Sequence, residues 1–507
     1  MPAATSRTVG AAHRAPARLP IAAWLLALLA VAGCSRDGER PAAPAGEALR
    51  PALLLVTLDT TRADAVAPEA PAADTPALAR LAASAVRFTQ AYAPAPMTLP
   101  AHASLMTGLY PAGHGVHENA RALAAGHPLV AERLRQAGYA TAAFVSAFPL
   151  DRQFGLARGF DLYDDELGAG REERPAAETT ARALAWLDGT AGGPTFLWVH
   201  YFDPHAPYEP PEPFGSRFPD DPYRGEVAAM DQQLGRLLDA FAARYGDHRI
   251  LVVGDHGEGL GEHGEAQHGN LLYQGVMRVP LLLAGSGLAP RVVAHPVSTR
   301  RVHDTLLAWA GLDGPASLLS AAAAAEPVLG EAMTPFLQYG WQPQVMAVSG
   351  RLKAIHAGRL EIYDVVADPG EGRDLAAEAR LDRAARQALR EYPLPDATPA
   401  APPVDDEARQ RLASLGYVAA EGRPPPREGA PRPADMAYLF ADLDRGSGHF
   451  VREEYAAAIP VFERVAAQDP GNLMVAVRLA VSHSLLGRDE EALRWFRRAE
   501  GIDGESL

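Results

Sequence analysis

Residues 52–58 read ALLLVTL, and this apolar run stops at Asp59. A short run that is apolar at nearly every position is typical of a strand buried on both faces, as strands of parallel sheets are. The run therefore predicts a buried parallel strand that places an acid, Asp59, at its carboxyl end.

Similar runs recur along the next 230 residues or so, and patterns typical of helices lie between them. One helical pattern begins after Thr75, a plausible N-cap that precedes Pro76. Strands that alternate with helices predict an α/β fold, with a mostly parallel sheet between helices. The other runs are TAAFVS (141–146), TFLWVHYF (195–202), RILVVGD (249–255) and VPLLLAG (279–285).

Polar residues collect at the carboxyl ends of these runs, where ligands bind in open α/β sheets. Asp59, His200, Asp203 and Asp255 all lie at or just past such an end. Two carboxylates and an imidazole, from Asp59, Asp255 and His256, would suit a divalent cation.

The remainder of the chain predicts three further parts. Residues 351–376 read as a hairpin with its turn at HAG, which indicates a small C-terminal sheet at the end of a catalytic domain spanning 51–393. Residues 394–434 are rich in Pro and Ala and read as a linker that contains a short helical patch. Residues 435–507 are helical and self-similar at an offset of 34 residues. That segment resembles tetratricopeptide repeats, which have this period, and a simple helical hairpin is the alternative.

The N-terminus predicts export and anchoring. Arginines precede an apolar run that is short for a membrane span, and the run ends in Val-Ala-Gly before Cys34, the only cysteine. This resembles a bacterial lipoprotein leader over 1–33, a lipidated Cys34 and a flexible tether over 34–50. An ordinary signal peptide or a short anchor are the alternatives. The expected location is the periplasmic side of the cell envelope, and Ser35 favours the outer membrane.

Composition excludes one class of partner. The chain has 507 residues, 48% of them hydrophobic, and a formal net charge of −15. A nucleic-acid binder needs a basic footprint, so none is expected here.

The segment GDHGEGLGEHGEAQHG (254–269) resembles the metal loop of the alkaline phosphatase superfamily, which includes sulfatases, phosphodiesterases and phosphoethanolamine transferases. The resemblance extends to His268, where the transferases keep a histidine. It implies an alkaline-phosphatase-like α/β fold and a site for one or two divalent cations, of Ca, Mg, Mn or Zn.

The segment HYFDPHAPYEPP (200–211) resembles the histidine-proline loop of the same superfamily. His205 matches a position that contacts substrate in sulfatases and transferases. Asp203 could join His205 and His268 around a second metal. The alternative is that His200 and Asp203 only cap the end of their strand.

The stretch PMTLPAHASLMTGLYPAGHGVHEN (96–119) resembles the active-site motif of sulfatases, with two departures. Thr98 replaces the cysteine or serine that becomes formylglycine, and His102 replaces an arginine. Oxidation of threonine cannot give an aldehyde, because its β-carbon carries a methyl group. The stretch is more similar to nucleotide pyrophosphatase/phosphodiesterases, which have a threonine nucleophile, then a histidine and an asparagine at the spacing of His102 and Asn119.

That resemblance implies roles for the matching residues. Thr98 would be a nucleophile activated by a metal that it also coordinates, and would form a covalent intermediate. His102 and Asn119 would bind substrate, and His205 or His268 would protonate the leaving oxygen. Of the other residues nearby, we expect Arg62 to brace the first loop, His114 to order its turn and His117 to be solvated.

The sequence therefore favours a sulfatase-family metal-dependent ester hydrolase that acts on phosphate esters or diesters. One alternative is a sulfuric ester hydrolase without formylglycine, and another is an envelope transferase that moves a phosphoryl-linked head group. A third is a non-catalytic lipoprotein scaffold. Expected partners are a small-molecule or envelope ester, the membrane through the lipid anchor, and a protein or second copy through the repeats.

Overall fold

A computed structural model describes residues 50–70, 73–190, 192–395, 406–415 and 429–502. The predicted leader, the lipidation site Cys34 and the tether up to residue 49 lie outside the described residues. Within these ranges, no helix combines the length and the apolar character that a membrane crossing requires.

The main sheet has the strand order β4-β3-β5-β1-β6-β7-β2-β8, with β9 beside β2. Its core, from β4 to β6, is parallel as predicted. The strands are β1 (Ala52–Leu58), β2 (Val86–Tyr92), β3 (Ala140–Phe144), β4 (Leu162–Asp164), β5 (Thr195–Tyr201), β6 (His248–Gly254), β7 (Arg278–Gly285), β8 (Arg291–Val293) and β9 (Val297–Ser298).

Strand β7 departs from that pattern. We expected the run at 279–285 among the parallel strands, but it is antiparallel to both β6 and β2. For two consecutive strands to be parallel, the chain must cross over to the other end of the strands before it re-enters the sheet. The chain between β6 and β7 instead forms loops and the short helices η4 (Glu262–Gly264) and α8 (Gln274–Met277), so it re-enters the sheet in the opposite direction.

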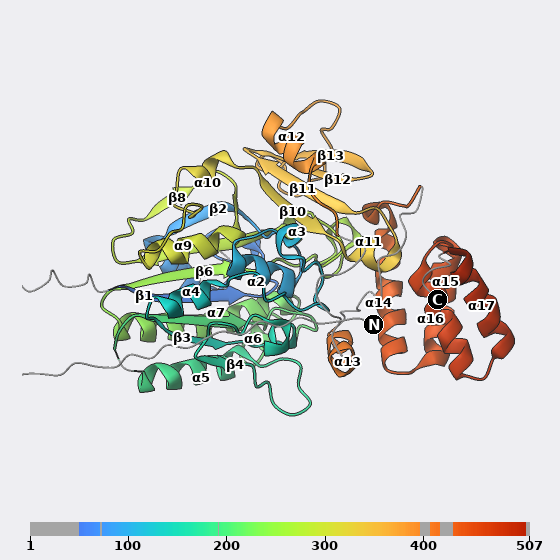
Figure 1. The fold of residues 1–507 in the computed structure, drawn as a ribbon, viewed down its shortest axis with the longest axis horizontal. Helices are drawn as coiled ribbons and strands as arrows, with labels where there is room; N and C mark the ends of the chain where they lie inside the picture. The colour runs from blue at the N-terminus through green and yellow to red at the C-terminus, as the bar shows by residue number, and fades with distance from the viewer. Residues whose placement is uncertain (1–49, 71–72, 191, 396–405, 416–428, 503–507) are drawn as a thin grey trace, which may run out of the picture. The chain divides into compact units, whose positions relative to one another are not determined.

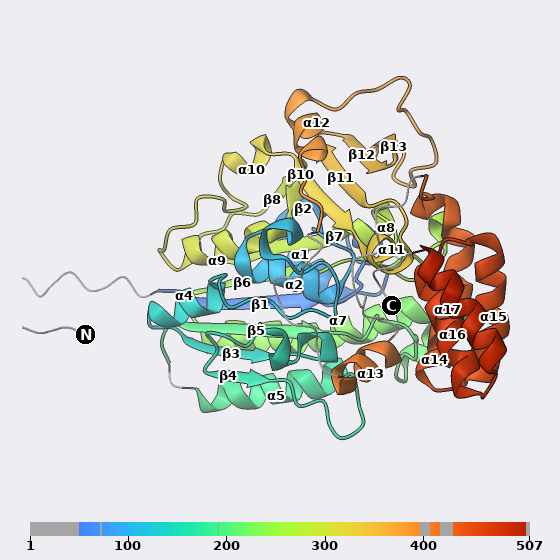
Figure 2. The same cartoon turned by 45° about the vertical axis from the view of Figure 1, so that its right-hand side comes forward.

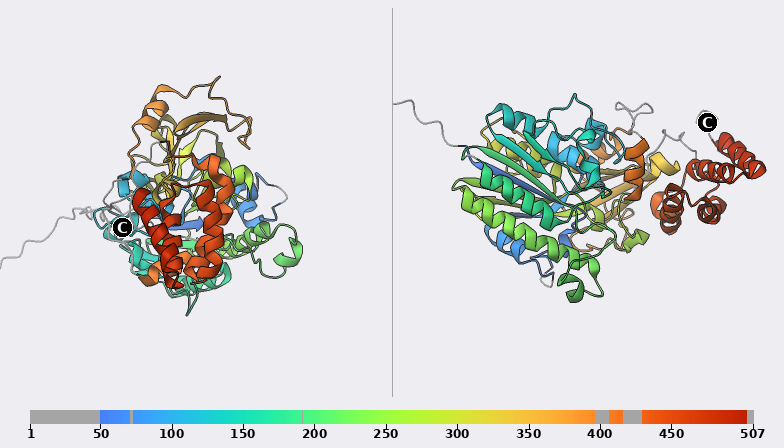
Figure 3. Two further views of the ribbon diagram at one scale, coloured as in Figure 1. Left: turned by 90° about the vertical axis from the view of Figure 1, so that its right-hand side faces the viewer. Right: turned by 90° about the horizontal axis from the view of Figure 1, so that it is seen from below.

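Helices cover both faces of the main sheet (Figures 1 and 2). Every residue of β1 is buried, and its side chains alternate between two apolar cores on opposite faces of the sheet. Leu53 and Leu55 lie in the first core, and Leu54 and Val56 lie in the second. The first core is closed by α2 (Thr98–Thr107), α4 (Val130–Gln136) and α9 (Val302–Trp309). The second is closed by α1 (Pro76–Ser84), α5 (Ala176–Gly189) and α7 (Pro222–Arg244), of which α5 and α7 face the viewer in Figure 3, right.

Helix α1 begins where the sequence predicts, but a different residue caps it. Thr75 makes no capping bond, and its Oγ1 accepts from the Ala67 amide at 2.9 Å. The first turn donates instead to Asp231 of α7, from the amides of Ala77 and Leu78 at 2.8 Å each. A cap from a distant helix is invisible to a local sequence pattern.

The predicted C-terminal sheet is antiparallel, with strands β10 (Val328–Ala332), β11 (Gln344–Ser349), β12 (Leu352–Ala357) and β13 (Arg359–Asp364). Gly358, at φ 74°, forms the predicted hairpin turn. Lys353, the only lysine of the chain, lies fully buried in β12, with its Nζ 2.8 Å from Oε1 of Glu371. This ion pair joins the small sheet to the loop after β13.

The C-terminal segment is helical, as predicted, and its consecutive helices pack side by side (Figure 3, left). It comprises η6 (Pro433–Leu439), α14 (Phe440–Val451), α15 (Tyr455–Gln468), α16 (Leu473–Leu485) and α17 (Asp489–Ile502). It contacts the preceding domain through the Trp341 indole, which donates to Asp469 at 2.7 Å. Within the predicted linker, α13 (Asp406–Ser414) buries Ala408 and Leu412.

Short helices complete the described chain. They are η1 (Ala63–Ala65), α3 (Pro111–His114), η2 (Phe148–Leu150), η3 (Arg152–Phe154), α6 (Phe214–Arg217), η5 (Thr299–Arg301), α10 (Ala322–Ala325), α11 (Thr334–Tyr339) and α12 (Arg383–Arg390).

Candidate active site

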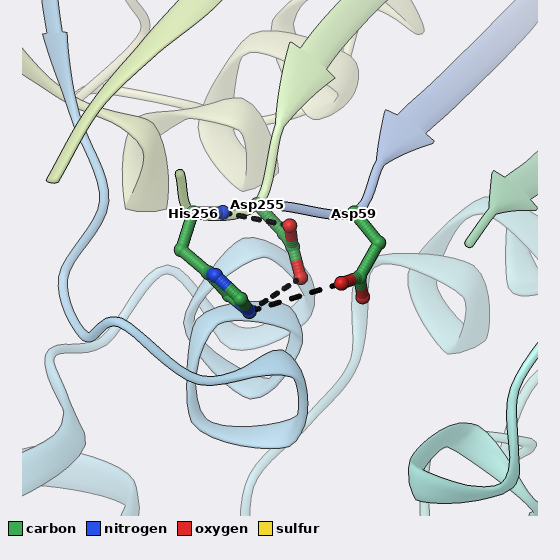
Figure 4. Close-up of side chains that lie close together, drawn as sticks. All are labelled: Asp59, Asp255 and His256. Carbon is green, nitrogen blue, oxygen red and sulfur yellow. Dashed lines mark hydrogen bonds and ion pairs between the residues drawn. The ribbon is translucent and has the colours of Figure 1, made fainter. Parts of the chain in front are cut away.

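Asp59, Asp255 and His256 meet at the carboxyl edge of the main sheet (Figure 4). Asp59 follows β1 and Asp255 follows β6, and these strands are hydrogen-bonded neighbours in register from Ala52 to Leu58. One ligand atom from each of the three residues lies within 4.8 Å of the others. His256 Nε2 is 3.6 Å from Oδ2 of Asp255 and 4.0 Å from Oδ1 of Asp59.

The atoms that face one another here lack hydrogen-bond partners. Oδ1 of Asp59, Oδ2 of Asp255 and Nε2 of His256 are buried and unpaired. His256 Nδ1 lies 3.0 Å from the Gly257 carbonyl oxygen, which can only accept, so Nδ1 carries the proton and Nε2 presents its lone pair. Buried polar atoms are costly unless they are satisfied. One divalent cation would satisfy all three atoms, and the mixed oxygen and nitrogen set suits Ca²⁺, Mg²⁺, Mn²⁺ or Zn²⁺.

The electrostatics of Asp59, Asp255 and His256 also favour a bound cation. Burial, and then the neighbouring Asp59 carboxylate, raise the pKa of Asp255 well above its usual range. Burial also acts to raise the pKa of Asp59, but the hydrogen bond from His200 and the nearby His256 outweigh it and hold that pKa below its usual range. Burial, and then the neighbouring His268, lower the pKa of His256 to about 4, so its imidazole is neutral near pH 7. Two adjacent buried carboxylates repel each other, and a bound cation removes that repulsion.

Thr98 is the first residue of α2, and its Oγ1 is buried without a hydrogen-bond partner. Asn119 lies beside it: its Oδ1 accepts from the Leu99 amide at 2.8 Å, which turns Nδ2 away as a buried, unpaired donor. The structure therefore brings together a hydroxyl and an amide donor whose partners are not supplied by the described protein.

Both ring nitrogens of His102, which was expected to bind substrate, lie within hydrogen-bonding distance of protein atoms. Its Nδ1 lies 2.7 Å from the Thr98 carbonyl oxygen and 3.5 Å from Oδ2 of Asp255, and its Nε2 lies 3.0 Å from Oγ1 of Thr57. The side chain is fully buried. Burial, and then the charge of His200, lower the pKa of His102 to about 3. With both ring nitrogens engaged by protein, His102 is placed to hold Thr98 and Asp255 rather than a substrate.

His200 and Asp203 also have protein partners. The Ser146 amide donates to His200 Nδ1 at 3.3 Å, which leaves the ring proton on Nε2, 3.2 Å from Oδ2 of Asp59. Asp203 accepts from the Ala176 amide at 2.9 and 3.0 Å, and so caps the start of α5. The Asp203 carboxylate, suggested for a second metal, is therefore engaged elsewhere, whereas His200 orients Asp59 of the candidate metal cluster.

The two remaining candidates, His205 and His268, lie together with His256. The ring centroids of His205 and His268 are 5.1 Å apart, and those of His256 and His268 are 4.5 Å apart. His205 stacks on Phe202 at 4.3 Å between centroids, and its Nδ1 contacts the Ala206 carbonyl oxygen at 2.7 Å. Among the described residues, no second group that could hold a metal accompanies the cluster of Asp59, Asp255 and His256.

Sequence reasoning missed Glu258, Thr57 and Trp198. Glu258 is fully buried, and its Oε1 lies 3.0 Å from His268 Nδ1 while its Oε2 accepts from the Tyr208 hydroxyl at 3.0 Å. Thr57 Oγ1 lies 3.0 Å from His102 Nε2 and accepts from the Trp198 indole at 3.0 Å. Thr57 did carry a signal, because it is the one polar residue of the run 52–58.

Three further expectations have clear outcomes. Arg62 braces the first loop by donating to Asp64 at 2.8 Å, and its NH1 also lies 3.0 Å from the Glu258 carbonyl oxygen. His114 orders its turn, because its Nδ1 accepts from the Val116 amide at 3.2 Å. His117 was expected to be solvated, and that expectation is wrong: its side chain is 11% exposed and its Nδ1 is 2.5 Å from Oε1 of Glu331 in β10. The second sheet, which is distant in sequence, supplies that partner.

Comparisons with known proteins agree with this architecture. A sulfatase family model matches residues 51–312, and a tetratricopeptide repeat model matches residues 452–506. A choline-sulfatase of Rhizobium meliloti is 25% identical, over 68% of this chain and 86% of the relative. A sulfatase of Formosa agariphila is 23% identical, over 59% of this chain and 77% of the relative.

Solved structures share the fold. The putative sulfatase YidJ from Bacteroides fragilis superposes with a TM-score of 0.58 at 18% identity, covering 67% of this chain and 95% of that one. A phosphonate monoester hydrolase from Silicibacter pomeroyi superposes with a TM-score of 0.56 at 21% identity, with the same coverage. The family match spans more than half of the chain and includes Asp59, Thr98, Asp255 and His256, and the chain therefore belongs to the sulfatase family of ester-bond hydrolases.

Proposed function

We propose that this sulfatase-family hydrolase is metal-dependent and uses Thr98 as its nucleophile, and that it acts on phosphate esters, diesters in particular. One observation carries the proposal. Like Oδ1 of Asp59, Oδ2 of Asp255 and Nε2 of His256, the Thr98 hydroxyl is buried without a hydrogen-bond partner. Three candidate ligands and a hydroxyl left unsatisfied together support a site that binds a cation and an anionic substrate.

Thr98 Oγ1 would lose its proton to a water molecule and attack the phosphorus, while the bond from phosphorus to the leaving oxygen breaks. The resulting phosphothreonine would then be cleaved by water, which restores the Thr98 hydroxyl and releases the phosphate product. A divalent cation held by Asp59, Asp255 and His256 would lower the pKa of the hydroxyl and offset the charge on the phosphoryl oxygens. Asn119 Nδ2 would donate to one of those oxygens.

The leaving oxygen needs a proton, and we assign its delivery to His205 or His268. Burial lowers the pKa of each ring to about 4, so both are neutral near pH 7, and a ring would first take up a proton from water before donating it. Glu258 holds His268 through Nδ1 at 3.0 Å, which fixes the orientation of the ring toward His205 and His256. A positioned general acid contributes about 100-fold or more to the rate of such reactions.

Sulfate ester hydrolysis is the second candidate, and it is favoured by the similarity to a choline-sulfatase. The identity of residue 98 is the argument against it. Formylglycine forms at a cysteine or serine, and threonine cannot be oxidised to the same aldehyde. We therefore place phosphate ahead of sulfate.

The test is a panel of 4-nitrophenyl sulfate, phosphate, phenylphosphonate and bis(4-nitrophenyl) phosphate, assayed with Ca²⁺, Mg²⁺, Mn²⁺ and Zn²⁺ in turn. We expect metal-dependent cleavage of the diester by wild type, loss of it in Thr98→Ala, and retention in Thr98→Ser, which keeps a hydroxyl. Circular dichroism of each variant controls for folding. Sulfate-selective turnover by wild type, or full activity of Thr98→Ala, would contradict the proposal.

We also propose that the enzyme is anchored on the periplasmic side of the envelope through lipid on Cys34. The leader-like sequence before Cys34 supports this placement. The C-terminal repeats, which match the tetratricopeptide family, would then bind a protein partner or a second copy. Detergent partitioning of wild type beside Cys34→Ala tests the anchor, which is disproved if both behave alike.

A further inference from the structure

The main sheet contains a chain of hydrogen bonds that ends on the proposed active site. Trp198 Nε1 donates to Oγ1 of Thr57 at 3.0 Å, and the same oxygen lies 3.0 Å from His102 Nε2. His102 Nδ1 lies 2.7 Å from the Thr98 carbonyl oxygen and 3.5 Å from Oδ2 of Asp255. All five side chains are fully buried.

Donor and acceptor chemistry sets the direction of this chain. A carbonyl oxygen only accepts, so His102 Nδ1 carries a proton and donates it to Thr98. An indole N–H only donates, so Thr57 accepts from Trp198. The Thr57 hydroxyl proton is then available to His102 Nε2. A single tautomer of the imidazole therefore pairs Trp198 Nε1, Thr57 Oγ1, both ring nitrogens of His102 and the Thr98 carbonyl oxygen.

The chain of hydrogen bonds joins three strands of the sheet to the helix that bears Thr98. Thr57 lies near the end of β1, Trp198 on β5 and His102 on α2, while Asp255 follows β6. Thr57 is paired with His200 on β5 and with Val253 on β6. It is the second-last residue of β1, and Asp59 follows directly after the strand. A polar side chain at this depth has no access to water and must be paired by protein.

We propose that Trp198, Thr57 and His102 form a positioning relay that fixes the start of α2, and with it Thr98, against the metal ligand Asp255. The relay rests on the proposed function, but it concerns residues that touch neither substrate nor cation. The contact that links Thr98 to Asp255 is made by His102 Nδ1, which lies 2.7 Å from the Thr98 carbonyl oxygen and 3.5 Å from Oδ2 of Asp255 (Asp255 is shown in Figure 4). Residues that orient metal ligands in this way typically affect metal affinity or activity about 10–100-fold.

The decisive substitutions are Thr57→Val and Thr57→Ser. Valine matches threonine in shape but lacks the hydroxyl, so Trp198 Nε1 and His102 Nε2 lose their shared partner. Serine keeps the hydroxyl and loses only a methyl group. Trp198→Phe removes the indole donor alone and serves as a second disruption of the relay.

A matched control comes from Thr141 on β3, which is 1% exposed and whose Oγ1 donates to the Gly159 carbonyl oxygen at 2.8 Å. Thr141→Val makes the same chemical change in a buried strand of the same sheet, away from the relay. It separates a general loss of stability from a loss of positioning.

The full chain is titrated with Zn²⁺ and, separately, Mn²⁺ by calorimetry, and kcat and KM are measured on bis(4-nitrophenyl) phosphate at saturating metal. We expect Thr57→Val to weaken metal binding or lower kcat about 10–100-fold with little change in KM. Trp198→Phe should have a smaller effect of the same kind, while Thr57→Ser and Thr141→Val should resemble wild type. Melting temperatures identify any variant that fails to fold.

Wild-type metal affinity and kcat in Thr57→Val would overturn the relay, as would Thr57→Ser being as impaired as Thr57→Val. The proposed function fails separately, if wild type binds no cation or shows no metal-dependent turnover of the diester. If only the substrate assignment is wrong, the calorimetric comparison of the Thr57 variants still decides the relay.

Discussion

At the scale of single residues, two polar side chains in the stretch 96–119 differ in whether the protein satisfies their hydrogen bonds. His102 has both ring nitrogens engaged by protein atoms, whereas Asn119 has one engaged atom, Oδ1, and one unpaired atom, Nδ2. A buried donor without a partner is expected where a ligand will supply the acceptor. Of the two, Asn119 is therefore the residue that we propose binds a substrate oxygen.

Asn119→Asp tests that assignment with little change of shape. The aspartate keeps an oxygen for the Leu99 amide, but it replaces the Nδ2 donor by a negative charge that repels a phosphoryl group. We expect kcat/KM for the diester to fall about 100-fold or more, with little change in melting temperature. Asn119→Ala, which also loses the bond to Leu99, should melt earlier. Steady-state kinetics decide, and near-normal turnover by Asn119→Asp would exclude Asn119 as a substrate donor.

At the scale of elements, the loops at the carboxyl ends of the strands are held by buried ionisable side chains from elsewhere in the fold. Arg62 binds the Glu258 carbonyl oxygen of the metal loop, and Glu226 of α7 accepts from the Glu209 amide of the histidine-proline loop at 2.7 Å. Glu226 is only 6% exposed. Burial, and then the charge of Asp203, raise the pKa of Glu226 to about 9. This loop is therefore held by a carboxyl group that stays protonated near pH 7.

A raised carboxyl pKa makes stability depend on pH in a defined direction. Between the usual pKa of 4.5 and the folded value of about 9, the folded state holds a proton that the unfolded state has lost. Stability should therefore fall as pH rises through this window, by up to about 1.4 kcal/mol per pH unit from this group. Glu226→Gln keeps an oxygen for the Glu209 amide and cannot ionise, so its melting temperature should fall less than that of wild type between pH 6 and 9. Parallel thermal melts check this, and identical slopes would contradict it.

At the scale of the whole molecule, the catalytic site draws on two neighbouring parallel strands, the helix α2 and the loops that lead into the antiparallel strand β7. The small second sheet stabilises this region through His117–Glu331 and through Lys353–Glu371, with Glu371 also accepting from the Gln274 amide at 2.6 Å beside the metal loop. Breaking a buried ion pair typically costs about 3–5 kcal/mol. The two sheets therefore form one structural unit around the site.

Cation binding should consequently stabilise the entire fold. A ligand that binds only the folded state adds about 2.7 kcal/mol when it is present at 100 times its dissociation constant. We expect a chelator to lower the melting temperature by a few degrees and a divalent cation to restore it. The double variant Asp255→Asn, His256→Gln should melt at the same temperature with or without chelator. If chelation leaves the wild-type melting curve unchanged, the cluster of Asp59, Asp255 and His256 does not hold a cation in the purified protein.

Strand runs, turn residues and motif spacing are local properties of the sequence. For that reason the sequence predicted the parallel strands of the sheet, the hairpin at Gly358 and the helical repeats. It also predicted the cluster of Asp59, Asp255 and His256. The direction of β7, the cap that Asp231 provides for α1 and the partner of His117 depend on segments far apart in the chain, and no local pattern contains them. The same reason applies to His102, which the family resemblance implied as a substrate contact, and to Asp203, which was suggested for a second metal. Their roles depend on which hydrogen-bond partners the fold brings to each atom, and only the tertiary structure decides that.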